Sequence, residues 1–140
     1  MRFFPGTIAA LLLTALAWPQ AAPAAGAVTG SWEGESKCTV PDSPCRDEHV
    51  VYRITADKKN PAQLSIDADK VVNGSPQFMG TIVCQYHPDQ ATLSCTGNTP
   101  KQDDWRFHLS GDTMTWTLTI GPEKQLYRRI TVRKTSPKAN

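Results

Sequence analysis

The sequence predicts an all-β fold, an antiparallel up-and-down barrel of about eight strands. Three observations predict it. Apolar residues recur at every second position in many short segments, clusters of Gly, Pro, Asn and Asp separate these segments, and no long segment repeats apolar residues with a helical period. Eight strands with one apolar face each can close into a barrel without exposed edges. A small β-sandwich is the alternative, but the regular succession of hairpins favours the barrel.

The expected strands follow one another with turns between them. Their approximate ranges are 31–38, 48–55, 63–72, 80–86, 91–96, 105–110, 113–120 and 125–134. Turn signals separate several of them, including Asn60-Pro61, the cluster VNGSPQ from Val72, and Gly111-Asp112. Within the seventh range MTWTLTI is a nearly pure alternation of apolar residues with threonine. Alternation of this kind is typical of a strand with one buried face.

The N-terminal residues have the features of a secretory signal peptide. A positive charge at Arg2 precedes an apolar stretch at about Ile8–Trp18, and the small residues AAPAAGA follow. The apolar stretch is shorter than the roughly 20 residues that a spanning helix needs, although an uncleaved N-terminal anchor is the alternative. We therefore expect a signal peptide at 1–27, one barrel domain at 28–134, a disordered tail at 135–140, and a periplasmic or secreted location.

The charge of the expected mature chain is close to neutral. Removal of residues 1–27 takes away one basic and no acidic residue, which leaves 14 basic and 13 acidic residues and a net charge of +1. This balance gives no electrostatic reason to expect a nucleic-acid partner. We also expect no stable membrane insertion and a monomer. After Glu123 the chain carries six basic and no acidic residues, which indicates a solvated edge strand or a basic docking face.

Four cysteines in a small exported chain indicate disulfides. Cys38 and Cys45 enclose the turn-rich hexapeptide TVPDSP. If TIVCQYHPDQATLSC folds as a hairpin with Asp89-Gln90 at its tip, Cys84 lies opposite Cys95, where antiparallel pairing brings Cβ atoms close enough for a disulfide. A zinc site built from the four cysteines is the rival, but the sequence lacks a C-x-x-C pair.

The stretch Gly30-Ser31-Trp32 at the head of the first strand resembles the G-x-W signature of lipocalin-like (calycin) barrels. The resemblance implies that Trp32 packs at one end of the barrel with a last-strand Arg across its ring, and we assign Arg128 to this barrel-closing role because it shares a face with Ile130 and Val132. The chain also resembles a group of small exported bacterial proteins with a W-E-G start and a C-x6-C loop, which implies the fold and no activity. The chain departs from true lipocalins, which are longer and usually carry a helix after the barrel, because no segment of this sequence has the pattern of that helix.

The inward-facing residues predicted by the alternation are large, and they indicate a mostly filled interior, since an eight-stranded barrel is just wide enough for side chains or one small ligand. A pocket would lie at one mouth. We expect its ligand-binding residues to be Tyr52, Trp105, Phe107 and Trp116, although aromatic side chains also dominate plain core packing.

Evidence for catalysis is thin. His49, His87 and His108 are scattered, and neither a metal-ligand spacing nor a nucleophile–base pattern is present. We therefore expect a non-enzyme with no catalytic residues, no metal and no cofactor.

The leading hypothesis is a non-catalytic exported binding protein of lipocalin-like type, holding a small hydrophobic or amphipathic ligand at the barrel mouth. The alternative is a periplasmic module that resembles protease or lysozyme inhibitors and binds an unidentified protein. Its recognition element would be a rim loop, for which the proline-braced segment Thr39–Pro44 is the candidate because a disulfide and prolines pre-organise it.

Overall fold

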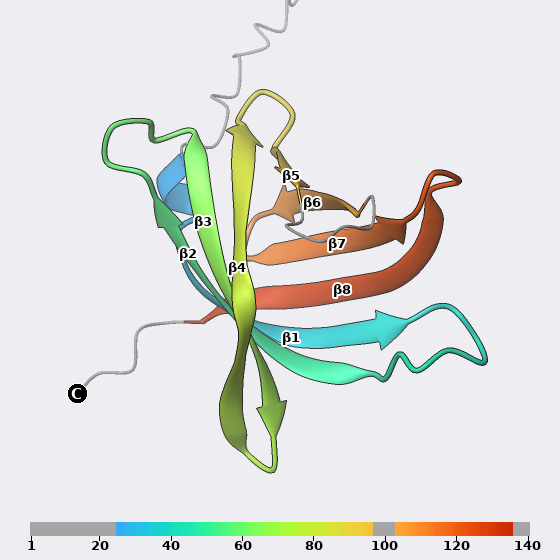
Figure 1. The fold of residues 1–140 in the computed structure, drawn as a ribbon. Coiled ribbons are helices and arrows are strands. Elements are labelled where there is room, and N and C mark those ends of the chain that lie inside the picture. The colour runs from blue at the N-terminus through green and yellow to red at the C-terminus, as the bar shows by residue number, and fades with distance from the viewer. Residues whose placement is uncertain (1–24, 97–102, 136–140) are drawn as a thin grey trace, which may run out of the picture.

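The computed structural model describes residues 25–96 and 103–135. Its elements are a 3-10 turn and eight strands (Figure 1): η1 (Ala25–Ala27), β1 (Gly30–Cys38), β2 (Glu48–Ala56), β3 (Gln63–Val72), β4 (Ser75–His87), β5 (Thr92–Thr96), β6 (Asp104–Ser110), β7 (Thr113–Ile120) and β8 (Gln125–Thr135).

The strands form a closed antiparallel barrel in sequence order, because β8 pairs with β1 as well as with β7. This closure confirms the predicted up-and-down barrel and excludes the sandwich. It is consistent with a lipocalin-like fold. Seven of the strands have bounds within one residue of the expected ranges, while β4 begins five residues earlier than expected.

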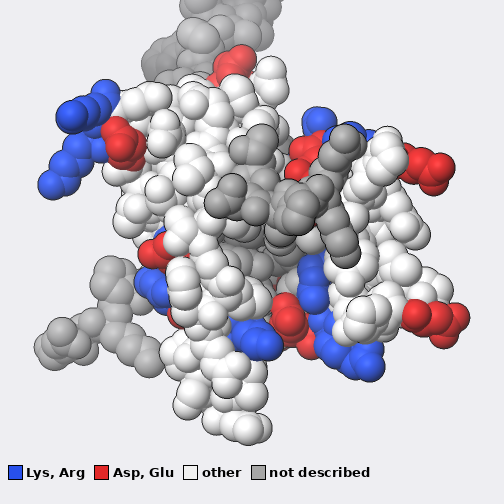
Figure 2. All heavy atoms as spheres, viewed as in Figure 1, with Lys and Arg blue, Asp and Glu red and all other residues white. Residues whose placement is uncertain are grey.

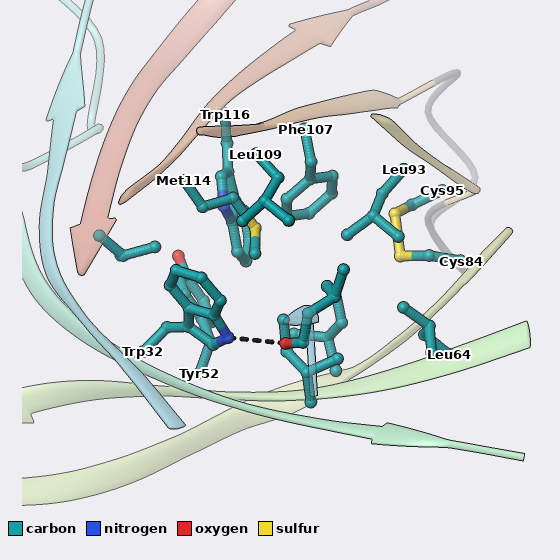
Figure 3. Packing of buried hydrophobic residues seen from close by; sticks show 14 of the residues in the cluster. Trp32, Tyr52, Leu64, Cys84, Leu93, Cys95, Phe107, Leu109, Met114 and Trp116 are labelled. Atoms are coloured by element: carbon teal, nitrogen blue, oxygen red, sulfur yellow. Dashed lines mark hydrogen bonds between the residues drawn. A yellow bond between two sulfur atoms is a disulfide. The ribbon is translucent and has the colours of Figure 1, made fainter. Parts of the chain in front are cut away.

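The inward faces of the strands supply one core that fills the barrel (Figure 3). Along the middle of β2 and β7 every second residue is buried and the residues between are partly or fully exposed, which shows why a period of two predicted this set. Ile82 and Trp105 pack against the core while remaining partly exposed. The buried members are Val28, Trp32, Val50, Tyr52, Ile54, Leu64, Ile66, Ala68, Cys84, Tyr86, Leu93, Cys95, Phe107, Leu109, Met114, Trp116, Ile130 and Val132.

Gly34 allows β1 and β8 to approach closely where the barrel closes. It lies opposite Val50 on β2 and Val132 on β8. A Cβ atom at Gly34 would come 2.8 Å from the Val132 Cα and still closer to the Thr131 carbonyl oxygen. These are backbone atoms, which could move only by distorting β8. A glycine is therefore required at this position of the W-E-G stretch, where β1 pairs with β8.

The early start of β4 extends the β3–β4 hairpin beyond the barrel wall. The cluster VNGSPQ was expected to be a loop, but its turn consists of Asn73 and Gly74 alone, both with positive φ. Such two-residue turns match the twist of paired strands, and glycine adopts a positive φ without strain. Pro76 is tolerated opposite Val71 because this part of β4 pairs with β3 and not with β5.

Short segments that were expected to lie outside the barrel domain belong to the described structure. Ala25–Ala27, expected to end the leader, form η1, and the following Val28 is fully buried. Thr135, expected to begin the tail, is the last residue of β8. The rest of the expected signal peptide and tail lies outside the described residues. In the part of the chain that is described, no helix is long and apolar enough to cross a membrane.

Candidate functional site

The four aromatic residues predicted to bind a ligand form one cluster, in which Tyr52, Phe107 and Trp116 are buried inside the barrel and Trp105 is partly exposed. Tyr52 stacks on Trp116 with ring centroids 3.9 Å apart, and Phe107 lies 3.6 Å from the same indole. Trp105 meets Trp116 edge-on at 6.3 Å. Tyr52, Phe107 and Trp116 are each at most 3% exposed, and Figure 3 shows their side chains converging within the barrel. The cluster therefore occupies the space in which a carried molecule would lie.

The buried indole of Trp116 carries an unpaired donor. Its Nε1 lies away from solvent and has no hydrogen-bond partner in the described structure. A buried N–H without an acceptor destabilises a fold by about 1–3 kcal/mol, so each such group calls for an explanation. The neighbouring Tyr52 hydroxyl is buried as well, and this burial raises its pKa far above the ordinary range.

The expectation that Arg128 lies across the Trp32 ring is wrong, because Lys134 takes that place. The Lys134 Nζ is 5.6 Å from the ring centroid. The register explains the difference: Trp32 pairs with Lys134, whereas Arg128 lies six residues earlier on β8, opposite Cys38. Lys134 also donates to the Ala27 carbonyl oxygen at 3.0 Å.

The G-x-W residues close one end of the barrel. Gly30 opens β1 opposite Ile54. The fully buried Trp32 donates from Nε1 to the Val28 carbonyl oxygen at 2.8 Å, the dashed line in Figure 3. The Val28 carbonyl, directly after η1, therefore satisfies the indole donor, and Trp32 presents no exposed surface to a ligand.

Arg128 instead organises a polar cluster at the other end of the barrel. Its Nη1 donates to the Ser36 hydroxyl at 2.9 Å and to the Arg46 carbonyl oxygen at 3.1 Å, and it lies 3.4 Å from a Glu48 carboxylate oxygen. Ser36 is 1% exposed. Arg128 therefore ties β8 to β1 and to the start of β2.

Both predicted disulfides are present, Cys38–Cys45 and Cys84–Cys95. Cys84 lies directly opposite Cys95, and Tyr86 opposite Leu93, as the predicted hairpin requires. Two disulfides fit an oxidising extracellular or periplasmic environment. The described cysteines leave no free thiol.

The loop within the Cys38–Cys45 disulfide is tied back to the barrel. The Thr39 hydroxyl donates to the Leu126 carbonyl oxygen at 2.8 Å, and the Thr39 amide donates to the Tyr127 carbonyl oxygen at 3.0 Å. The Cys38 amide donates to the Asp47 carboxylate. Val40 is half-buried, so this loop displays charge and proline rather than a large apolar side chain. Its contacts suit a structural brace.

The β3–β4 hairpin is the feature that sequence reasoning missed. Its strand β4 carries three large hydrophobic residues with exposed side chains: Phe78 at 65%, Val83 at 46% and Met79 at 43%. In Figure 1 its tip is the lowest part of the described ribbon, and Figure 2 shows this lobe free of charged side chains. The segment 71–79, VVNGSPQFM, contains no charged residue. The NG turn flanked by valines was the signal for an extended hairpin.

The histidines are not grouped. His49 bridges two carboxylates on β1, with Nε2 2.7 Å from Glu33 and Nδ1 2.8 Å from Glu35, and hydrogen bonds to Glu35 and then Glu33 raise the pKa of His49. His108 faces outward from β6. Within residues 25–96 and 103–135 no cluster of His, Cys, Asp or Glu could hold a metal ion.

Comparison of the chain with protein-family models and with curated proteins found no match.

Proposed function

We propose that this protein is an exported, non-catalytic binding protein that recognises a protein partner through the β3–β4 hairpin. The observation that carries the proposal is the projecting, uncharged hairpin tip with Phe78 and Met79 exposed. A soluble protein gains stability by burying such side chains, and exposing them together favours an interaction role. The hairpin takes over the role first assigned to the Thr39–Pro44 loop.

The shape and charge of the hairpin favour a protein pocket as its occupant. Beyond Lys70 the strand β3 no longer pairs with β2, so the tip of the hairpin is two strands wide and can enter a concave apolar site. Phe78 lies opposite Asp69 at the base of this tip, where the rim of such a site would bury it as an anchor. At its base the charges balance, since Asp67 and Asp69 accompany Arg53 and Lys70. A hairpin that binds an anionic bilayer would instead be ringed by basic residues.

Site-directed photo-crosslinking tests this proposal. A photoreactive amino acid placed at Phe78 and expressed in a bacterial periplasm should capture one dominant partner, whereas the same group at Lys58, in the loop at the other end of the barrel, should not. The partner is then purified and its affinity measured by calorimetry. The double variant Phe78→Ser/Met79→Ser should weaken binding at least about tenfold, because burying each of these apolar side chains contributes roughly 1.5–3 kcal/mol to the binding free energy.

Three results would count against the proposal of a protein partner at the hairpin. Equal capture from positions 78 and 58 would show nonspecific contact, and unchanged affinity in the double variant would place the interface elsewhere. Sedimentation with phosphatidylglycerol vesicles that depends on Phe78 would replace the protein partner with a membrane surface. The melting temperature of the double variant should match that of the parent protein, which separates lost binding from lost folding.

The second candidate is a carrier of a small amphipathic molecule, and the unpaired Trp116 Nε1 favours it. An acceptor on a bound molecule would satisfy this donor, and the Tyr52, Phe107 and Trp105 rings would contact its apolar part. Since these rings already touch Trp116, a ligand must displace side chains in order to enter. For this reason the carrier ranks below the hairpin.

Native mass spectrometry of protein from the periplasm distinguishes the carrier. A native mass that exceeds the denatured mass by a discrete small molecule supports it, and equal masses count against it. Trp116→Phe removes the donor and keeps most of the apolar surface. If a ligand uses this donor, Trp116→Phe should lower its occupancy.

A further inference from the structure

A groove of about 470 Å³ lies on the outside of the barrel, over β5 to β8. Its lining residues come from neighbouring positions of these strands and include Phe107, Trp116 and Ile130, whose side chains are buried in the barrel, together with outward-facing residues beside them. This site is separate from the hairpin and from the aromatic cluster inside the barrel.

The first row of side chains across the groove places one hydroxyl between two guanidinium groups. Arg106 on β6 pairs with Thr117 on β7, which pairs with Arg129 on β8. Strands lie about 4.8 Å apart, so the two arginine Cα atoms are separated by roughly 10 Å. That spacing lets both long side chains reach one oxyanion placed above Thr117. Guanidinium groups match the oxygens of phosphate and sulfate esters through paired hydrogen bonds.

A second row runs parallel to the first and offers uncharged donors and acceptors. His108 pairs with Thr115, which pairs with Thr131. This row is two residues further along each strand, or about 7 Å from the first. Hydroxyl and imidazole groups at this distance suit the hydroxyls of a sugar ring whose charged ester lies in the first row.

The electrostatics of the groove favour an anion. Its lining residues include two arginines and no carboxylate. Arg129 is exposed and forms no ion pair with any residue in the described part of the chain. Arg106 meets the nearby Asp104 through Nε at 3.1 Å, which leaves its terminal nitrogens for another acceptor. Lys124 lies 3.8 Å from the same carboxylate and offsets its charge.

We propose that this outer groove binds a sugar that carries a phosphate or sulfate ester. The ester lies over Thr117 between Arg106 and Arg129, and the sugar hydroxyls meet His108, Thr115 and Thr131. Both esters present a tetrahedral oxyanion, so the proposal names their shared chemistry. It does not depend on the hairpin.

Backbone-amide NMR titrations with glucose 6-phosphate and glucose 6-sulfate test the proposal, with glucose and inorganic phosphate as the component controls. At least one ester should shift amides of β6, β7 and β8 and bind at least tenfold more tightly than either control. Arg129→Gln should weaken this binding about tenfold. The matched control is Arg133→Gln, which removes an outward-facing charge of the same strand that does not line the groove.

Several outcomes would overturn the proposal. Absent groove shifts would exclude the site, and equal losses in Arg129→Gln and Arg133→Gln would reduce it to nonspecific charge attraction. Inorganic phosphate binding as tightly as both esters would remove the sugar from the proposal. Thr117→Val should weaken ester binding while leaving the melting temperature unchanged. The Phe78→Ser/Met79→Ser variant should bind the ester normally, which keeps this result distinct from that of the proposed partner.

Discussion

The two halves of β4 differ in how they are held, and the difference separates stability from recognition. Residues Val83–Gln85 pair with strands on both sides, and a disulfide joins Cys84 to Cys95 in the core. Residues Ser75–Phe78 pair with β3 alone, Met79 lies at a register shift without a β3 partner, and the side chains of Phe78 and Met79 are exposed. One strand therefore carries a fastened half and a free half. The free half can change its surface without disturbing the barrel, which suits a recognition element.

The largest expected effect comes from removing the disulfide of the fastened half. Cys84→Ala/Cys95→Ala should lower the free energy of unfolding by about 2–3 kcal/mol, because the disulfide closes a short loop in the unfolded chain. Urea denaturation followed by tryptophan fluorescence measures this change. The matched variant in the free half, Phe78→Ser/Met79→Ser, should change the same free energy by less than about 0.5 kcal/mol. Equal losses in both variants would mean that the hairpin supports the barrel.

The next effect concerns the junction between the halves, where a buried carboxylate holds the base of the hairpin. Asp69, 6% exposed at its side chain, lies 2.6 and 3.1 Å from two nitrogens of Arg53 on β2. Asp69→Asn should destabilise the hairpin base by roughly 1–2 kcal/mol, since charge-assisted hydrogen bonds are lost while Arg53 remains partly solvated. Hydrogen exchange should rise for amides at 69–79 and stay unchanged around Cys95. Faster exchange across the whole barrel would contradict a local role.

The same ion pair predicts a pH dependence. The hydrogen bond from Arg53 holds the pKa of Asp69 below its usual value. A carboxyl group with a lowered folded-state pKa contributes stability above its unfolded pKa, near about 3.9, and that stability is lost as the pH falls through the folded pKa. Exchange at the hairpin base should therefore rise at acidic pH in the parent protein and change less in Asp69→Asn.

The sequence predicted the fastened half well because its signals were local. Alternation assigned Cys84 and Cys95 to one face, and a short turn fixed their register, so the disulfide followed without knowledge of the rest of the barrel. The buried aromatic cluster followed in the same way. Each inward position depends on the period of its own strand.

The free half and the groove were missed because their signals were not local. Pro76 indicated a loop, and it fits a strand only where no further strand pairs with it. The assignment of Arg128 to the Trp32 ring failed because the register between the first and last strands depends on the tilt of the whole barrel. The approach of Arg106 and Arg129 across β7 depends on strand pairing that neither strand specifies alone.

A smaller effect should come from the turn of the free half. Gly74 has a φ of 77°, where a side chain costs roughly 1 kcal/mol, and an added Cβ would meet no neighbouring atom. Gly74→Ala should therefore strain the turn without a clash, raise exchange near the tip, and weaken the proposed partner binding. Global urea unfolding should stay within about 0.5 kcal/mol of the parent value. A larger global loss would show that turn formation contributes to barrel stability.

The smallest expected effect tests at which residue of β4 the fastened half ends and the free half begins. Just beyond Gly80, the Thr81 hydroxyl donates to the Asp67 carboxylate at 2.6 Å on the exposed face. Thr81→Val keeps the branched shape that strands favour and removes this bond, and water can replace the lost partner, so the unfolding free energy should fall by about 0.5 kcal/mol or less. Exchange of the Thr81 and Ile82 amides should rise slightly, with no change at Phe78. If exchange at Phe78 rises as well, the hairpin and the barrel wall open as one unit, and the free half of β4 begins deeper in the barrel than Gly80.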